Sequence, residues 1–156
     1  MKIALGMDHR GVDVGRLLAA HLPGEGHEVQ VLGQCEGESW DYPDVTWAVA
    51  RAVADGEAQR GILVCGTGIG ASIAANKVAG VRAALVGDMT AAESSRRHND
   101  ANVLCLAGDA LTDDRRILRI VAAWLAAPFD GGRHARRVNK IAAIERGENP
   151  VEAVKA

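Results

Sequence analysis

Short apolar runs alternate with longer segments of helical period along the chain, and this alternation restricts the fold more than any other feature. Runs that predict strands lie at residues 2–7, 28–32, 61–65, 82–86 and 102–107. Apolar residues recur with helical spacing near residues 11–22, 44–55, 69–79, 90–98, 113–127 and 134–146. Such alternation is typical of βαβ units around a parallel sheet. We therefore predict an α/β fold: a single-domain, Rossmann-like three-layer sandwich with five parallel strands and an extra C-terminal helix.

The chain has the size and composition of one globular domain. Its 156 residues are 48% hydrophobic and 24% charged, which suits a single buried core. No Gly-, Pro- or Ser-rich linker divides the sequence. We expect one domain over residues 1–148 and a short polar tail over residues 149–156.

Charge and hydropathy argue against several classes of partner. The net charge is −2 and the basic residues are spread out, whereas binding to nucleic acid needs a broad basic face. No apolar run approaches the roughly 20 residues that cross a bilayer, and no signal-peptide core is visible. The three cysteines Cys35, Cys65 and Cys105 form no C-x-x-C pair, which favours reduced thiols. We expect a cytoplasmic protein that binds neither membrane nor nucleic acid.

The segment GILVCGTGIGASIAANK at residues 61–77 carries the strongest local sign of chemistry. A buried strand is expected to end at Cys65 and to lead into a helix through Gly66, Gly68 and Gly70. Glycines let the backbone approach a ligand closely, and the first amides of a helix are unpaired donors. The pattern therefore predicts that an oxyanion can bind at this turn.

Cys65 lies at the lip of this predicted turn, beside the hydroxyl of Thr67. Amide donors and the helix dipole would favour the thiolate, which makes Cys65 a candidate base or nucleophile. Taken alone, a cysteine at the end of a strand is more often a small core residue. The carboxyl end of a parallel strand is, however, the edge at which open α/β sheets bind ligands.

The same segment has a second interpretation. Gly66-x-Gly68-x-x-Ala71 satisfies the dinucleotide fingerprint, and Asp88 follows the next strand in the acidic position. Against an NAD(P)-binding function, the motif falls on the third strand instead of the first, and one short domain leaves little room for a separate substrate domain.

Other polar residues follow predicted strands or lie at helix ends. Asp8 and His9 end the first strand and could orient a sugar hydroxyl or a phosphate, although an N-cap role for Asp8 is equally open. His98, near the end of the fourth helical segment, could shuttle a proton or act only as a cap. Arg133 and Arg137 have i, i+4 spacing, which suits either a phosphate site or a solvated helix face.

Five co-linear motifs together resemble the ribose-5-phosphate isomerase B family, whose wider family includes galactose-6-phosphate isomerase subunits. They are DHRG at 8–11, DYPD at 41–44, CGTGIGASIAANK at 65–77, RHNDANVL at 97–104 and GGRHARRV at 131–138. The resemblance covers nearly the whole chain. It implies an aldose–ketose isomerase of a small phosphorylated sugar that needs no cofactor and no metal ion and forms a homodimer or a dimer of dimers. A sugar-phosphate-binding protein without catalysis is a further alternative.

The resemblance also implies a role for each matching residue. Cys65 would be the base that moves the proton between C1 and C2, since Ala71 stands where some relatives have a glutamate. Thr67 and His98 would assist ring opening, and the amides of Gly66 to Gly70 would stabilise the enediolate. The hydroxyls of the sugar would be bound by Asp8, Tyr42 and Asn99, and the phosphate by His9, Arg133 and Arg137.

One position departs from the family pattern. Where many members have an arginine after the fifth strand, this sequence reads Gly108-Asp109-Ala110. A carboxylate there would repel a phosphate dianion. Asp109 could point away, pair with Arg10, which is unusual in its turn, or with another cation, or bind a substrate hydroxyl. We favour the pairing or the hydroxyl, and with either we expect weak turnover of ribose 5-phosphate.

Overall fold

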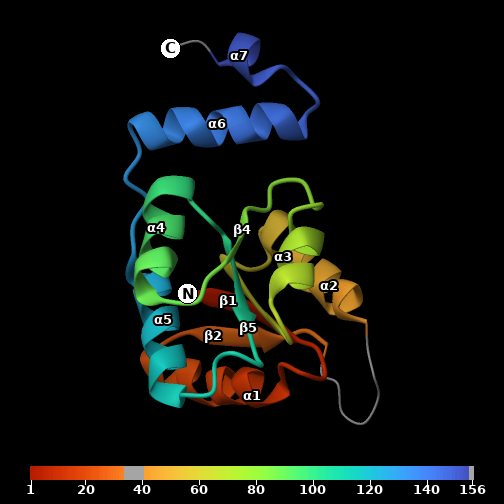
Figure 1. Ribbon diagram of the computed structural model, residues 1–156, viewed down its shortest axis with the longest axis vertical. Coiled ribbons are helices and arrows are strands. Elements are labelled where there is room, and N and C mark those ends of the chain that lie inside the picture. Colours follow the sequence, from red (N-terminus) through yellow and green to blue (C-terminus); the bar gives the residue numbers. More distant parts are fainter. Residues whose placement is uncertain (34–40, 155–156) are drawn as a thin grey trace.

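A five-stranded parallel sheet forms the centre of the molecule (Figure 1). The computed structural model describes residues 1–33 and 41–154. The strands are β1 (Lys2–Met7), β2 (Glu28–Val31), β3 (Arg60–Cys65), β4 (Ala83–Leu85) and β5 (Val103–Ala107). They pair in the order β2-β1-β3-β5-β4, and every pair is parallel. The predicted fold class is confirmed, and each strand lies within one residue of its predicted bounds.

Helices follow each strand, and two more end the described chain. They are α1 (Val12–His21), the 3₁₀ turn η1 (Leu22–Glu25), α2 (Tyr42–Ala54), α3 (Ile69–Ala75), α4 (Met89–Asn99), α5 (Asp114–Ala126), α6 (Arg133–Glu145) and α7 (Pro150–Ala153). α6 is the extra helix predicted from the sequence. α7 is a four-residue helix inside the predicted polar tail, where the side chain of Asn149 accepts the N–H of Val151 at 3.0 Å.

The prediction that α3 continues to residue 79 is wrong. Nδ2 of Asn76 donates to the carbonyls of Ser72 and Ala83 at 2.9 Å each, and its Oδ1 accepts the N–H of Ala83 at 2.9 Å. The amide side chain therefore ties the helix end to the start of β4. This tertiary contact ends the helix although the local sequence would continue it.

Two apolar cores lie on the two faces of the sheet, which gives three layers. On one face α1, α4 and α5 cover strand residues that include Ile3, Leu5, Ile62 and Leu104. On the other face α2 and α3 cover the alternate residues, which include Ala4, Leu63, Cys65, Val103 and Cys105. Because successive residues of a strand point to opposite faces, β3 is buried on both sides.

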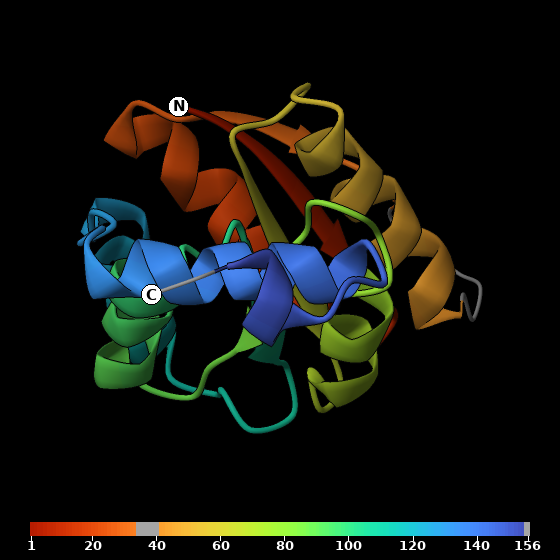
Figure 2. The ribbon, with the colours of Figure 1, turned by 90° about the horizontal axis from the view of Figure 1, so that it is seen from above.

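α6 belongs to neither face. It lies beyond the amino ends of β4 and β5, above the end of α4, as the two views at right angles show (Figures 1 and 2). Glu145 at its end accepts the N–H of Gly80 at 2.9 Å, just before β4. Two large apolar side chains of α6, Ile141 and Ile144, are 44% and 61% exposed. Among the described residues no helix has the length and apolar character needed to span a membrane.

Candidate functional site

The carboxyl ends of β1 and β3 are neighbours at the point where the chain reverses its direction of winding across the sheet. β2 lies on one side of β1, and the next connection returns across β1 to β3. Asp8 follows β1, and its N–H donates to the carbonyl of Val64 at 3.1 Å, one residue before Cys65. In open α/β sheets this crevice is where ligands bind. The fold therefore brings the predicted residues Asp8 and Cys65 together at the expected place.

Cys65 ends β3 with its side chain almost fully buried, at 5% exposure. The N–H of Gly68 donates to its Sγ at 3.2 Å. Gly68 has φ +72°, and a side chain there would overlap Leu85, so the turn requires glycine. Thr67 is exposed, and its Oγ1 accepts the N–H of Ile69 at 3.3 Å. The turn thus directs one backbone donor at the sulfur.

A second buried thiol shows that burial alone does not make a reactive cysteine. Cys105 lies in the middle of β5, opposite Leu63. Burial, and secondarily the neighbouring Cys65, raises the pKa of Cys105 far above its ordinary value. Cys105 is therefore a core residue, whereas Cys65 stands at a strand end beside a backbone donor. Cys35 lies outside the described residues.

Asp8 fixes the turn between β1 and α1. Its Oδ1 accepts the N–H of Arg10 at 2.9 Å and the N–H of Gly11 at 3.0 Å. The carboxylate therefore caps the turn, while the cap position of α1 itself is Gly11. His9 is exposed on the same turn.

Tyr42 reaches the glycine-rich turn from the start of α2. A methyl group built on Gly70 would lie 2.5 Å from Cζ and 2.9 Å from the hydroxyl oxygen of Tyr42. The ring therefore lies against the backbone of Gly70, and any side chain at that position would displace it. Because Tyr42 remains 40% exposed, the phenol forms part of the open wall near Cys65.

An ion pair borders the other end of the glycine-rich turn. The guanidinium of Arg10 donates from Nε to Oδ1 of Asp109 at 3.2 Å and from Nη2 to Oδ2. A methyl group on Gly66 would lie 2.9 Å from Nε of Arg10. The expected pairing of Asp109 with Arg10 is confirmed.

The remaining predicted residues lie at the opposite edge of the sheet. α4 runs back from the carboxyl edge to the amino edge, so His98 and Asn99 at its end precede β5. On β3, the four residue steps from Gly61 to Cys65 alone span roughly 13 Å. Within one chain, His98 and Asn99 therefore cannot reach the Cys65 turn.

α6 gathers a cationic group around His98. The ring of His134 stacks on that of His98, with centroids 4.3 Å apart and planes 7° from parallel. The flanking residues Arg133 and Arg137 are exposed on the same helix. Burial and then the positive charges of His98, Arg133 and Arg137 lower the pKa of His134, and its buried Nδ1 has no hydrogen-bond partner within the described chain. Sequence reasoning missed this stack, since only the docking of α6 on α4 creates it.

His98, Asp130 and His134 lie close enough to be considered as metal ligands, with one ligand atom of each within 4.8 Å of the others. Asp130 is already paired with Arg97 at 3.2 Å. This ion pair and the surrounding cations favour an anion over a metal ion.

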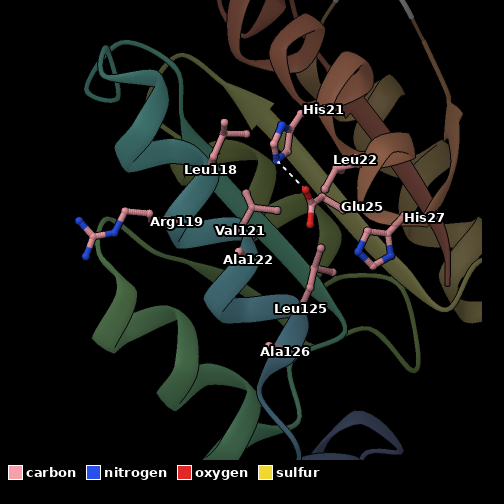
Figure 3. Close-up of a pocket in the computed structure, with 10 residues that line it drawn as sticks. All are labelled: His21, Leu22, Glu25, His27, Leu118, Arg119, Val121, Ala122, Leu125 and Ala126. Atoms are coloured by element: carbon pink, nitrogen blue, oxygen red, sulfur yellow. Dashed lines mark ion pairs between the residues drawn. The ribbon is translucent and has the colours of Figure 1, made fainter.

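A pocket of about 510 Å³ lies apart from both groups, between α1–η1 and α5 (Figure 3). Its walls are mainly apolar, with Leu118, Val121 and Leu125 on one side and Leu22 on the other. His21 and Glu25 pair across 3.8 Å at its rim. Its polar lining residues His21, Glu25, His27 and Arg119 lie far from the glycine-rich turn in the sequence and are not among the predicted site residues, so we do not assign the chemistry to it.

The pattern of the Ribose/Galactose Isomerase family matches residues 3–141. The chain belongs to this family. It is 47% identical over 148 residues to ribose-5-phosphate isomerase B of Escherichia coli K12, covering 95% of this chain and 99% of the relative. It is 40% identical to D-erythrulose-4-phosphate isomerase of Pectobacterium atrosepticum, covering 95% and 97%.

Solved structures agree with this assignment. Ribose-5-phosphate isomerase B of Clostridium thermocellum superposes with a TM-score of 0.92 at 50% identity, covering 94% of this chain and 99% of the other. The enzyme of Mycoplasma genitalium, solved with bound ribulose 5-phosphate, superposes with a TM-score of 0.89 at 41% identity, covering 93% and 96%.

The structure gives the acidic residue of the NAD(P)-binding alternative another role. The Asp88 carboxylate accepts the N–H of Ala91 at 2.8 Å as the cap of α4.

Proposed function

We propose that this protein is an aldose–ketose isomerase that interconverts a phosphorylated aldose and its ketose through a cis-enediolate, with Cys65 as the base. The observation that most supports this proposal is the position of Cys65 at the crevice between β1 and β3, with the Gly68 amide nitrogen 3.2 Å from its sulfur. Family membership supports the reaction class. The names of the Escherichia and Pectobacterium relatives support a sugar phosphate as substrate.

The reaction moves one proton between two carbons and one between two oxygens. The Cys65 thiolate removes the proton from C2 of the open-chain aldose, and negative charge develops on the oxygen at C1. The Cys65 thiol returns the proton to C1, and the hydroxyl proton at C2 is transferred to the oxygen at C1, which gives the ketose with a carbonyl at C2. No electron acceptor is needed, which fits the proposal of no cofactor and no metal ion. Backbone amides of the 66–70 turn are suited to stabilise the enediolate oxygen.

The other residues fall into three proposed roles. Thr67 and His98 assist ring opening, since a hydroxyl and an imidazole can exchange protons with the ring oxygen and the anomeric hydroxyl. Hydroxyl groups of the sugar bind to Asp8, Tyr42 and Asn99. The phosphate binds to His9, Arg133 and Arg137.

This assignment requires two copies of the chain. His9 is on the turn beside Cys65, but His98, Asn99 and the two arginines lie at the far edge of the sheet. A second subunit can supply that far edge to the Cys65 turn. Exposed apolar side chains on α3 and α6 offer surface for such an interface: Ile69, Ile73, Ile141 and Ile144 are 53%, 58%, 44% and 61% exposed. We propose a homodimer, or a dimer of dimers, in the cytoplasm.

The test is a panel of tetrose, pentose and hexose phosphates assayed for aldose–ketose conversion with no cofactor added. The proposal expects conversion of at least one of them. A requirement for NAD(P) would indicate a dehydrogenase. Saturable binding of the sugars without turnover would indicate a sugar-phosphate-binding protein, and either result would overturn the proposal.

A further inference from the structure

The turn that carries Arg10 is held tightly at the carboxyl edge of the sheet. A methyl group on Gly11 would overlap the carbonyl of Val64, and one on Gly108 would lie 2.6 Å from the carbonyl oxygen of Arg10. Hydrogen bonds from the backbone of the turn to Asp8 add a further constraint. The backbone of Arg10 is therefore clamped between the ends of β3 and β5.

The side chain of Arg10 is held as well. Asp109 binds the guanidinium through two donors, and the N–H of Asp109 donates to the carbonyl of Gly66 at 3.0 Å. The pair thus joins the turns that follow β1, β3 and β5. Its guanidinium lies against Gly66, the residue after Cys65, at the opposite end of the glycine-rich turn from Tyr42.

This pair is placed for contact with a ligand. The side chains of Arg10 and Asp109 are 56% and 40% exposed, and exposed ion pairs add little to stability. Within residues 1–33 and 41–154, Nη1 of Arg10 has no acceptor. A guanidinium with two of its five N–H groups bound to a carboxylate keeps donors for another partner.

We propose that Arg10, oriented by Asp109, is a specificity-determining residue that contacts the sugar. This rests on the isomerase function proposed above. The carboxylate cancels the positive charge, so the pair suits a neutral hydroxyl better than a phosphate, and Nη1 is the donor. The guanidinium also lies against Gly66, the residue after Cys65. Arg10 therefore selects among sugar phosphates by the hydroxyl group that its Nη1 can reach.

The experiment compares kcat/KM for tetrose 4-phosphates, pentose 5-phosphates and hexose 6-phosphates in the wild type and in Arg10→Ala. Removing the side chain should lower kcat/KM about tenfold for the sugar that the wild type converts best, and should lower the ratio of its kcat/KM to that of the other sugars by about the same factor. Arg10→Lys keeps the charge but loses the paired geometry, so its ratio should lie between those of the wild type and Arg10→Ala. Asp109→Asn should shift the ratio in the same direction by less.

Arg16→Ala is the matched control, because Arg16 is an exposed arginine on α1 outside this turn. Its ratio should equal that of the wild type, and the melting temperatures of all variants should agree. An unchanged ratio in Arg10→Ala, or an equal fall for all sugars, would overturn the role of Arg10 while leaving the isomerase function intact. A wild type that converts no sugar phosphate would overturn the proposed function itself.

Discussion

Arg96 donates from Nη1 to Oδ1 of Asp100 at 2.8 Å, and this pair anchors the turn that carries His98 and Asn99. The Arg96 side chain is only 5% exposed; it also donates to the carbonyl of Ala101 at 2.7 Å. Arg82 binds the other carboxylate oxygen of Asp100 at 2.8 Å. Asp100 has φ +47°, the one positive φ outside glycine in the described chain, so two arginines hold it in a conformation that costs energy.

The first prediction concerns this turn. Asp100→Asn keeps a residue type that tolerates the left-handed region but leaves Arg96 buried without its charged partner. The free energy of unfolding should fall by about 2 kcal/mol in urea titrations, and kcat should fall as His98 shifts. The control is Asp55→Asn, which breaks the exposed Arg51–Asp55 pair and should cost less than about 1 kcal/mol. Equal effects would contradict a special role for Asp100.

The second prediction concerns pH. Burial and neighbouring positive charges lower the pKa of His134 in the folded protein. An unfolded histidine titrates near pH 6.5, so below about that pH the unfolded chain binds more protons than the folded one. The contribution of His134 to the free energy of unfolding should therefore be complete above about pH 6.5 and should be lost as the pH drops below that value.

Unfolding in urea at a series of pH values measures this effect. His134→Asn should flatten the slope of stability against pH below about 6.5. Asn139→Ala, which changes an exposed residue of the same helix that carries no titratable group, should leave the slope as in the wild type. A slope in His134→Asn equal to that of the wild type would show that another group causes the acid sensitivity.

The third prediction tests whether two subunits share each site. Cys65→Ala and His98→Asn should each be nearly inactive alone. Unfolding and refolding the two variants together should restore about a quarter of wild-type activity, because half of the dimers are mixed and each of these contains one intact site. No recovery, with mixed dimers demonstrated by mass, would mean that the two residues do not act across the interface.

The fourth prediction concerns metals. Activity should be complete after exhaustive treatment with EDTA, since the chain needs only the thiolate and backbone donors for proton transfer. The His98–Asp130–His134 group is the place to look if this prediction is wrong. A metal site there would be indicated if EDTA removed the activity, a divalent ion restored it, and His134→Asn prevented this restoration.

Much of the fold could be predicted because its causes are local in the sequence. Strands buried on both faces appear as unbroken apolar runs, as in GILVC before the glycine-rich turn. The end of α3 could not be found this way, because Asn76 acts through a contact with β4. α7 did leave a signal in Asn149-Pro150, a cap followed by a proline at the first helical position.

The roles of the site residues stay a prediction, and only part of their arrangement could be expected from the sequence. The pairing of Arg10 with Asp109 could be expected, since two unusual residues of opposite charge follow strands that end at the same edge. The separation of His98 from Cys65 follows from the topology, because a helix between parallel strands ends at the amino edge. The stack of His98 on His134 had no such signal, since it depends on where α6 docks.

The most direct test of the account is the turnover of Cys65→Ala with whichever sugar phosphate the wild type converts best. A general base typically contributes about 10² to 10⁴ in rate, so kcat should fall by at least about a hundredfold while fold and sugar binding persist. Cys105→Ala, which removes the buried thiol of β5, should keep most of the activity. Retention of more than about a tenth of wild-type kcat in Cys65→Ala would contradict the assignment of Cys65 as the base.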